Sequence, residues 1–389
     1  MLEYVLAFLG LYSVVFYSLL YLTQSEKVRA DPEAKNFLSI SVIIPAYNEE
    51  KSIGKTIESV LALNYPKKLL EVIVVNDGSK DKTAEVAKGH NIKLIDKKNT
   101  GKANSINVAL KEAKGELVAI MDADSYVSKG TLLKMVGYFA DSEVASVTAA
   151  MKVWEPKTLV QRMQRGEYII NTFLKKLQSF VDGISVTPGP FSIYRRSVLL
   201  ELGGFDESTL TEDQEIALRI QAKNLRIENS INAEVFTDTP SSFRSLFKQR
   251  RRLYLGSLSN LWKHKYLFSP KYGDFGMFVL PLALSLLLLT LLSFLLHLPS
   301  LDFSLRFEPA SLRFYYLEFT STTFLFVFVM LVNMAVFYYA MRDTREYGVF
   351  GGFLFLFAIS FLLTFVWIAV IAELAFNSAA GLKPAWRGD

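Results

Sequence analysis

The segment Leu117-Val118-Ala119-Ile120-Met121-Asp122-Ala123-Asp124-Ser125 decides the fold. It is an apolar run of strand length that ends in two aspartates separated by one residue. Because side chains alternate along a strand, Asp122 and Asp124 point the same way. Two carboxylates at a strand end suit a divalent cation that also holds phosphate groups. An aspartate-rich turn before a helix that begins near Thr131 explains the same residues, so the pair alone does not choose between the two interpretations.

The composition divides the chain of 389 residues into three parts. Apolar residues make up 51% of the sequence, which is high for a soluble enzyme. They concentrate in residues 1–22, where Glu3 is the one charged side chain, and after about residue 275. The segment between is long enough for one domain with its own core. Cysteine is absent, which excludes disulfides and thiolate catalysis.

The formal net charge of +5 comes from basic residues that cluster beside the apolar segments. Such clusters are typical of a membrane surface. We therefore expect the lipid bilayer as a partner and no nucleic acid.

Four apolar segments are long enough to cross a bilayer, which takes about 20 helical residues. We expect residues 1–23 to form a retained N-terminal helix, because no basic residues precede it and no cleavage site of small residues follows it. Residues 273–389 are expected to form a C-terminal membrane domain. Its three helices are expected at about residues 277–298, 320–339 and 349–376.

The distribution of lysine and arginine sets the expected orientation through the positive-inside rule. These residues follow the first span, precede the second and lie between the third and fourth. This pattern places residues 23–276 in the cytoplasm of a multi-pass protein of the cell membrane. Lys383 and Arg387 would then lie outside, which conflicts mildly with the rule.

Strands alternate with helices between the first two spans. Strands are expected at residues 39–45, 70–75, 92–95, 117–121 and 144–149, and helices after Glu49 and at residues 80–87 and 103–113. This order indicates βαβ units and a mostly parallel, Rossmann-like sheet. We expect residues 24–38 to form a linker and residues 39–240 to form this α/β domain.

Three strand ends carry polar residues. They are Tyr47-Asn48-Glu49, Asp77-Gly78-Ser79 and Asp122-Ala123-Asp124. In parallel sheets ligands bind beyond the carboxyl ends of the strands, so the convergence favours a metal and phosphate site over a turn. The chain has neither the glycine-rich dinucleotide fingerprint nor the phosphate loop of the nucleoside triphosphatases, which argues against both.

Three segments together resemble the donor half of a family 2 glycosyltransferase with the GT-A fold. They are Val42-Ile43-Ile44-Pro45-Ala46-Tyr47-Asn48-Glu49, Val74-Val75-Asn76-Asp77-Gly78-Ser79 and Met121-Asp122-Ala123-Asp124. The resemblance implies that a nucleotide sugar, usually a UDP-sugar, is the partner and that Asp77 contacts its base. The other donor-binding residues implied are Ala46, Tyr47, Asn48, Glu49 and Ala123.

The same resemblance implies that Asp122 and Asp124 hold Mg²⁺ or Mn²⁺ against the donor diphosphate. Lys102 lies in Asn99-Thr100-Gly101-Lys102-Ala103-Asn104, which is similar to the Gly-Lys segment that lies near the donor in this family. A solvated lysine at the start of a helix is an equally good interpretation of Lys102.

The acceptor half contains two further matches. Gly189 and Arg195 fit the family's spacing of a glycine and an arginine beside the acceptor sugar, although a basic surface pair explains Arg195 as well. Thr211-Glu212-Asp213 matches the Thr-Glu-Asp of the synthases that make extracellular polysaccharides. The match implies that Asp213 is the general base and that Glu212 contacts the acceptor. Capping of a helix by Thr211, with acids in its first turn, explains the same residues.

Residues 241–272 are expected to form amphipathic helices on the membrane surface. They contain Gln249-Arg250-Arg251-Arg252-Leu253, which is similar to the Gln-x-x-Arg-Trp of the polysaccharide synthases. The match implies that Gln249 and Arg252 lie at the donor diphosphate. Leu253 replaces the tryptophan, and any interfacial helix carries arginines.

The resemblance implies a metal-dependent enzyme that transfers a sugar with inversion to the hydroxyl of a growing polysaccharide, as in the synthases of cellulose, chitin, hyaluronan and poly-N-acetylglucosamine. The alternative is transfer of one sugar to a polyprenyl phosphate, a lipid-linked oligosaccharide or a glycolipid. Leu253 favours the alternative, and so do the four spans, which form only a thin channel unless copies assemble into a homo-oligomer. A non-catalytic transport component would carry repeated spans, which the sequence lacks.

Overall fold

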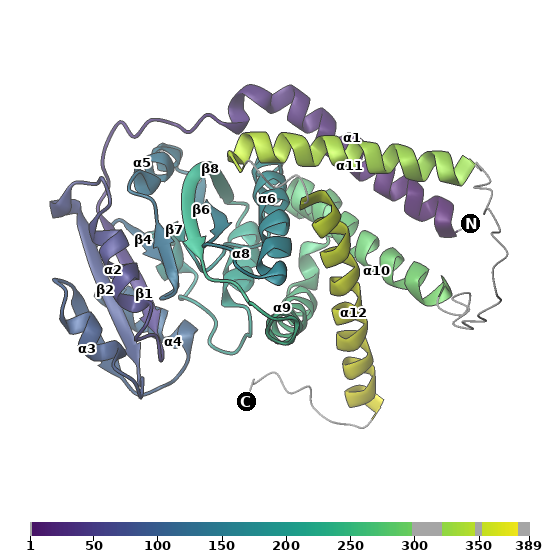
Figure 1. Cartoon of the computed structure of the whole chain (residues 1–389). Helices are drawn as coiled ribbons and strands as arrows, with labels where there is room; N and C mark the ends of the chain where they lie inside the picture. Colours follow the sequence, from purple (N-terminus) through teal and green to yellow (C-terminus); the bar gives the residue numbers. More distant parts are fainter. Residues whose placement is uncertain (1, 298–320, 347–351, 380–389) are drawn as a thin grey trace.

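The computed structural model describes residues 2–297, 321–346 and 352–379, which form an α/β unit and a group of long helices (Figure 1). The strands are β1 (Ile40–Ala46), β2 (Leu70–Asp77), β3 (Lys93–Lys97), β4 (Leu117–Ile120), β5 (Ser125–Val127), β6 (Val144–Val153), β7 (Ser192–Arg195) and β8 (Arg226–Thr237). The helices of the α/β unit are α2 (Ile53–Leu61), α3 (Thr83–Lys88), α4 (Lys102–Glu112), α5 (Thr131–Val136), α6 (Leu159–Ser179), α7 (Arg196–Glu201) and α8 (Glu212–Ala222). The remaining long helices are α1 (Leu2–Val28), α9 (Phe243–Lys263), α10 (Leu280–His297), α11 (Ser321–Thr344) and α12 (Gly352–Ala379).

Within the described residues, the strands form one sheet in the order β3-β2-β1-β4-β7-β6-β8-β5. The pairs β1–β2, β1–β4, β2–β3 and β6–β8 are parallel, whereas β4–β7, β6–β7 and β5–β8 are antiparallel. The expected α/β class and its parallel first half are confirmed. The antiparallel pairs come from β5, β7 and β8, three short or interrupted strands that the sequence did not predict.

The register of the parallel strands brings their carboxyl ends to one edge. Ala46 at the end of β1 pairs with Asn76 near the end of β2, and Ile43 pairs with Ile120 at the end of β4. Every residue of β1 and β4 is buried, as expected for strands that are covered on both faces. The polar residues that follow these strands therefore emerge side by side.

Helices cover the two faces of the sheet and bury its alternating side chains. On one face, Val42 and Ile44 pack with Ile57 of α2 and Leu132 of α5 in one core. On the other face, Ile43, Ile73 and Val75 pack in a second core, which α4 and α8 complete with Ile106, Ala109, Leu110, Ile216 and Ile220. These two cores hold the strand ends in place.

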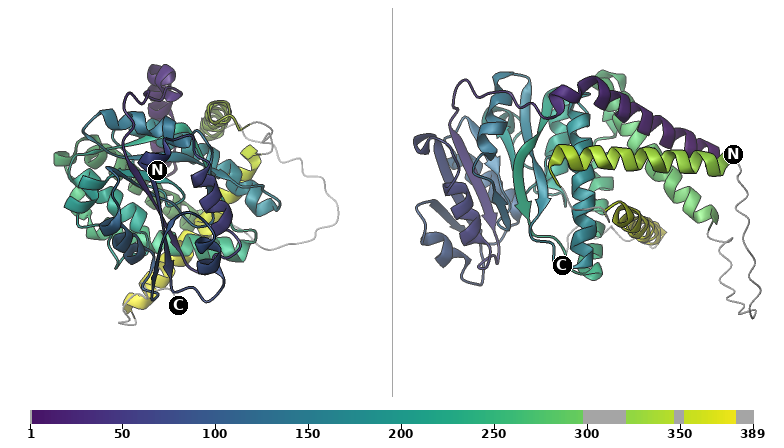
Figure 2. Two further views of the ribbon diagram at one scale, coloured as in Figure 1. Left: turned by 90° about the vertical axis from the view of Figure 1, so that its left-hand side faces the viewer. Right: turned by 45° about the horizontal axis from the view of Figure 1, so that its top comes forward.

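The long helices gather on one side of the α/β unit, where α6 lies between the sheet and α11 and α12 (Figure 1). Figure 2 shows α1 and α11 running side by side away from the sheet. Tyr21 of α1, Phe173 of α6 and Phe337 of α11 share one buried cluster. The ion pairs Arg29–Asp343 (2.7 Å) and Arg165–Glu346 (2.5 Å) fasten the base of α11 to the rest of the chain.

The three predicted C-terminal spans coincide with α10, α11 and α12. Their predicted limits at residues 298, 320 and 349–351 lie outside the described residues, as do Lys383 and Arg387. The first helix continues past its predicted end to Val28. By length and composition, the one stretch of the described residues that could cross a membrane is Phe8–Val28.

Candidate active site

A cavity of about 270 Å³ lies at the edge where β1, β2 and β4 end. We call it the strand-end cavity. Its lining residues are Pro45, Ala46, Tyr47, Glu49, Asp77, Lys102, Ser105, Asp122, Ala123, Asp124 and Arg252. The structure thus brings together all of the residues predicted to bind the donor except Asn48 and Gln249.

Asn48 lies behind the strand-end cavity and joins two of its loops. Its backbone has a φ of 57°, its amide N–H donates to Ser79 Oγ (3.0 Å), and its Oδ1 accepts from the backbone N–H of Lys80 (2.9 Å). Asparagine tolerates this left-handed conformation. Asn48 therefore positions the loops after β1 and β2 and does not line the cavity.

Asp77 anchors the loop that leads into α4. Its buried carboxylate accepts the backbone N–H groups of Thr100 (3.0 Å) and Gly101 (2.9 Å) and pairs with Lys97. Gly101 has a φ of 99°, a conformation that favours glycine. These contacts set the start of α4 and with it the position of Lys102.

Asp124 is half-buried near other carboxylates. Thr56 Oγ1 donates to the carbonyl oxygen of Ala123 (2.7 Å) and fixes the turn after β4. Burial raises the pKa of Asp124 to about 7, and repulsion from Asp122 and Glu49 adds to this effect. Negative charge is therefore poorly compensated at this point of the cavity.

The donor set of Asp122 and Asp124 fits Mg²⁺ or Mn²⁺, because both ions prefer carboxylate oxygens and leave coordination positions for phosphate. Among the described residues, no group of three or more acidic, histidine or cysteine side chains forms a complete metal cluster. A cation held here would take its other ligands from substrate or water.

Lys102 links the strand-end cavity to α8. Its Nζ lies 2.5 Å from the Asp122 carboxylate and 3.0 Å from that of Glu212. Burial alone would lower the pKa of Lys102, but the two carboxylates outweigh burial and raise it well above its ordinary value. Lys102 is the first residue of α4, as the helix-start interpretation expects, and its side chain is 36% exposed. It also lines the strand-end cavity and pairs with two carboxylates.

Gly189 packs directly against this ion pair. Its carbonyl oxygen accepts the backbone N–H of Asp122 (3.1 Å). A Cβ at this position would lie 2.7 Å from Lys102 Nζ and 2.8 Å from the Asp122 carboxylate. The close approach requires glycine.

Glu212 and Asp213, at the start of α8, have opposite pKa shifts. Burial raises the pKa of Asp213 to about 6, and the charge of Glu212 raises it further. Burial also acts on Glu212, but the charge of Lys102 outweighs burial there and lowers the pKa of Glu212. Divergent pKa values in neighbouring carboxyls are typical of acid–base sites.

The hydroxyl of Thr211, the N-cap residue of α8, contacts α9. This hydroxyl makes no capping hydrogen bond; instead, Asn260 of α9 donates from its side chain to Thr211 Oγ1 (2.9 Å) and to the Thr211 carbonyl oxygen (3.0 Å). Thr211 does occupy the N-cap position of α8, with Glu212, Asp213 and Glu215 in the first turn as the capping interpretation expects. Its side chain, however, joins α8 to α9 and does not cap the helix.

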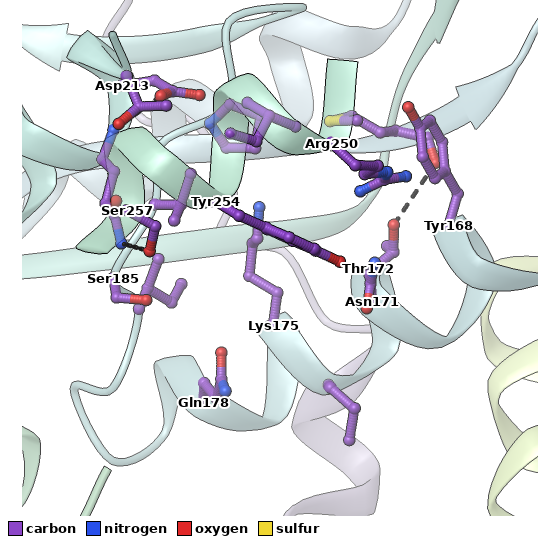
Figure 3. Close-up of a pocket in the computed structure, with 18 of the residues that line it drawn as sticks. Tyr168, Asn171, Thr172, Lys175, Gln178, Ser185, Asp213, Arg250, Tyr254 and Ser257 are labelled. Atoms are coloured by element: carbon purple, nitrogen blue, oxygen red, sulfur yellow. Dashed lines mark hydrogen bonds between the residues drawn. The ribbon is translucent and has the colours of Figure 1, made fainter. Parts of the chain in front are cut away.

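A second cavity, of about 450 Å³, lies between α6 and α9. We call it the α6–α9 cavity. The rest of its lining comes from β6, the loop of residues 184–188, the start of α8 with Asp213, and α9. Figure 3 shows the Lys175 side chain extending from α6 toward Tyr254. The two cavities are adjacent, since Lys102 lines the first and is paired to Glu212, the neighbour of Asp213.

Consecutive residues of α9 line different cavities. Arg252 lines the strand-end cavity, whereas Gln249, Arg250 and Leu253 line the α6–α9 cavity. Gln249, which was predicted to bind the donor, therefore lines the α6–α9 cavity and not the strand-end cavity, although Arg252 lies only three residues further along α9. Arg250 forms an ion pair with Glu167 of α6 (2.8 Å).

Arg195 lies away from both cavities. It pairs with Leu117 at the start of β4, opposite the end that carries Asp122. Its guanidinium donates to the carbonyl oxygens of Val144 (2.8 Å), Phe139 (2.6 Å) and Asp141 (2.6 Å). The prediction that Arg195 contacts the acceptor is wrong, because these carbonyls occupy it in a structural role.

Two features of the α6–α9 cavity were missed in the sequence. Lys175 projects into it from α6, and the ring of Tyr254 stacks on Trp367 of α12 at a centroid distance of 3.9 Å. The position of Lys175 on the inner side of an amphipathic helix could have indicated its place in the cavity. The second joins segments more than a hundred residues apart, and no local pattern announces it.

Comparison with known proteins gives three findings. Residues 41–203 match the family model described as glycosyl transferase family 2. The poly-beta-1,6-N-acetyl-D-glucosamine synthase of Staphylococcus epidermidis is 31% identical over 220 residues, which are 55% of this chain and 53% of that protein. The synthase of the same name from Staphylococcus aureus is 28% identical over 247 residues, 62% of this chain and 60% of that protein.

The chain therefore spans little more than half the length of these curated relatives. A solved mannosyltransferase from Pyrobaculum calidifontis, in complex with GDP-Man and Mn²⁺, has a TM-score of 0.55 and 21% sequence identity, and the match covers 92% of this chain and 98% of that one. This likeness concerns the fold, which is the α/β GT-A type that the sequence motifs implied.

Proposed function

We propose that the chain, whose residues 41–203 match the model of glycosyl transferase family 2, is a membrane-bound inverting glycosyltransferase of that family. In this proposal the enzyme transfers a sugar from a nucleotide sugar to a hydroxyl of a growing polysaccharide, and a UDP-sugar is the preferred donor. One observation carries this proposal. Lys102 joins Asp122 in the strand-end cavity to Glu212, and the next residue, Asp213, lines a second cavity of suitable size for an acceptor.

The strand-end cavity is the proposed donor site. Asp77 faces the base, and Asp122 and Asp124 would hold Mg²⁺ or Mn²⁺, which neutralises a diphosphate when bound. Arg252 supplies a cation on the membrane side of the same cavity. A guanidinium in that position stabilises charge on the departing nucleotide.

Asp213 is the proposed general base. Its raised pKa, about 6, leaves it ionised at neutral pH and still basic enough to accept a proton. The acceptor oxygen attacks the anomeric carbon, the bond from that carbon to the phosphate oxygen breaks, the proton passes to Asp213, and the nucleoside diphosphate leaves. One displacement of this kind inverts the configuration at the anomeric carbon.

We assign the membrane contact to the long helices and to α9. Phe243, Phe247 and Trp262 of α9 are 50%, 40% and 74% exposed, with lysines and arginines between them, which is the pattern of an interfacial helix. In this proposal residues 1–23 and the helices of residues 273–389 span the cell membrane, residues 24–38 form the linker, and residues 39–240 form the cytoplasmic catalytic domain. Residues 241–272 lie on the membrane surface.

The alternative product is a lipid that carries one added sugar. It is favoured by Leu253, which lines the α6–α9 cavity where the polysaccharide synthases have a tryptophan. A homo-oligomer would widen the channel that a polymer requires. The curated relatives named above support the polymer.

The decisive experiment uses membranes that contain the full chain. They are incubated with labelled UDP-N-acetylglucosamine, UDP-glucose or GDP-mannose and with Mg²⁺ or Mn²⁺, and the label is followed into a high-mass polymer or an organic-extractable lipid. We expect metal-dependent labelling of polymer. Labelled lipid alone would refute the proposal that the product is a polymer. Failure to cleave any of the three nucleotide sugars would refute the proposal that the chain is a glycosyltransferase.

A further inference from the structure

The α6–α9 cavity contains a cation that the proposed reaction does not use. Lys175 is on the inner face of α6, and its side chain extends into the cavity (Figure 3). In the residues that the structure describes, no carboxylate oxygen lies within 4.0 Å of its Nζ, and no hydrogen bond holds it. Its position is therefore not explained by contacts within the chain.

The other basic groups near this cavity have partners. Arg250 is paired with Glu167, so its charge is compensated. Lys176, the next residue of α6, donates to the carbonyl oxygen of Asn229 (3.0 Å) and contacts Tyr138 Oη (3.2 Å). Lys175 differs from both, because its ammonium meets only the space of the cavity.

Burial acts strongly on Lys175. It lowers the pKa of Lys175 to about 8, although the charge of Asp213 acts in the opposite direction. Lys175 is half-buried in the wall of the cavity, and an ammonium that is withdrawn from water without a carboxylate partner is unfavourable. A ligand with a negative charge would remove this cost, and Asn171, Gln178 and Ser185 of the same cavity offer neutral hydrogen-bonding groups for hydroxyls.

We propose that the acceptor carries an anionic group, a carboxylate or a phosphate, that forms an ion pair with Lys175 while the acceptor hydroxyl lies at Asp213. This inference rests on the proposed function and narrows its acceptor to anionic carbohydrates. An uncharged chain of N-acetylglucosamine would leave Lys175 unpaired. Lys175 is thus a specificity residue for the acceptor.

The test compares acceptors that differ in one group. The full-length enzyme, in detergent and with the nucleotide sugar found in the donor screen, is offered octyl glucoside, octyl glucuronide or octyl glucoside 6-phosphate. The measured quantity is kcat/KM for each anionic acceptor divided by kcat/KM for the neutral one. We expect a ratio of at least about 10, since a charge-assisted hydrogen bond contributes about 1.5–3 kcal/mol. The glucuronide and the phosphate arms show which anion fits.

Variants of two lysines then locate the effect. Lys175→Met should bring the ratio close to 1 by raising KM for the anionic acceptor, and Lys175→Arg should restore part of it. Lys157→Met, at an exposed position before α6, should leave the ratio unchanged. A wild-type ratio near 1, transfer to no anionic acceptor, or equal losses for both acceptors in Lys175→Met would overturn the inference. Absence of nucleotide-sugar cleavage in the wild type would instead overturn the proposed function.

Discussion

The two cavities of this protein differ in charge and in construction. The strand-end cavity collects Glu49, Asp77, Asp122 and Asp124 on loops that follow strands, with Lys102 and Arg252 opposite them. The α6–α9 cavity is walled by faces of helices and has Lys175 and Asp213 as its uncompensated charges. The first is suited to a polyanion with its cation, and the second to a carbohydrate whose single anionic group pairs with Lys175. The boundary between them, at Lys102, Glu212 and Asp213, is where a donor and an acceptor would meet.

The largest effect is expected from Asp213→Asn. If Asp213 serves the acceptor side alone, its loss should lower kcat by about 10²–10⁴-fold, the usual contribution of a general base, while nucleotide affinity stays within about twofold of wild type. Radiolabel transfer and calorimetric titration with UDP measure the two. The exposed Asp274→Asn is the control. Near-normal turnover in Asp213→Asn would refute the assignment.

Substitutions of Arg250 and Arg252 on α9 should have different effects, because the two arginines line different cavities. Arg252→Met removes a cation from the strand-end cavity and should reduce kcat by about 10²–10³-fold with little change in Tm. Arg250→Met leaves Glu167 buried without its partner, which should destabilise the protein by about 3–5 kcal/mol. Enzyme assays and thermal unfolding of both variants are the measurements. Identical behaviour of the two variants would mean that the assignment of α9 faces is incorrect.

The pH dependence of transfer tests the assignment of Asp213 as the general base without a substitution. Asp213 must be ionised to accept a proton, and its pKa is raised to about 6. We therefore expect kcat/KM to fall about tenfold for each pH unit below this value and to level off above it. Transfer measured from pH 4.5 to 8 at saturating metal checks this. A profile that is flat through pH 6 would exclude Asp213 as the base.

The smallest effect concerns stability without substrates. A carboxyl whose folded pKa is raised destabilises the fold once the pH exceeds its unfolded value, so at pH 8 Asp213→Asn should be more stable by about 1–3 kcal/mol. Asp206 provides the contrast, because hydrogen bonds from Lys263 and Ser208 overcome burial and lower its pKa to about 2. Asp206→Asn should therefore lower Tm. Thermal unfolding of both variants decides whether the shifts have these signs.

The strand-end cavity could be predicted from the sequence because its parts are short, contiguous segments. Each consists of a buried strand and the polar residues directly after it, so Asp77, Asp122 and Asp124 need only a parallel register to come together. Lys102 was left open, since its partner Glu212 is more than a hundred residues away.

The α6–α9 cavity could not be predicted in this way. Its walls come from β6, α6, α8, α9 and a loop, and their relative orientation depends on tertiary packing, such as the contact of Asn260 with Thr211. The same limit explains Gln249 and Arg195. The motif on α9 predicted one site for Gln249 and Arg252, but the packing of α9 places them in different cavities. Arg195 belongs to β7, which runs antiparallel to β4 and therefore places Arg195 beside the start of β4, away from Asp122.

The position of α9 has a consequence for how substrates influence each other. One rigid helix carries Arg252 in one cavity and Leu253 in the other, and Arg251–Glu373 (2.5 Å) and the stack of Tyr254 on Trp367 attach it to α12. A shift of α9 on binding in one cavity would move side chains that line the other cavity and would change its affinity. By thermodynamic reciprocity, the factor by which nucleotide changes acceptor affinity equals the factor by which acceptor changes nucleotide affinity. Because α12 is attached to α9 by the same contacts, a displacement of α12 would change the affinity of both cavities.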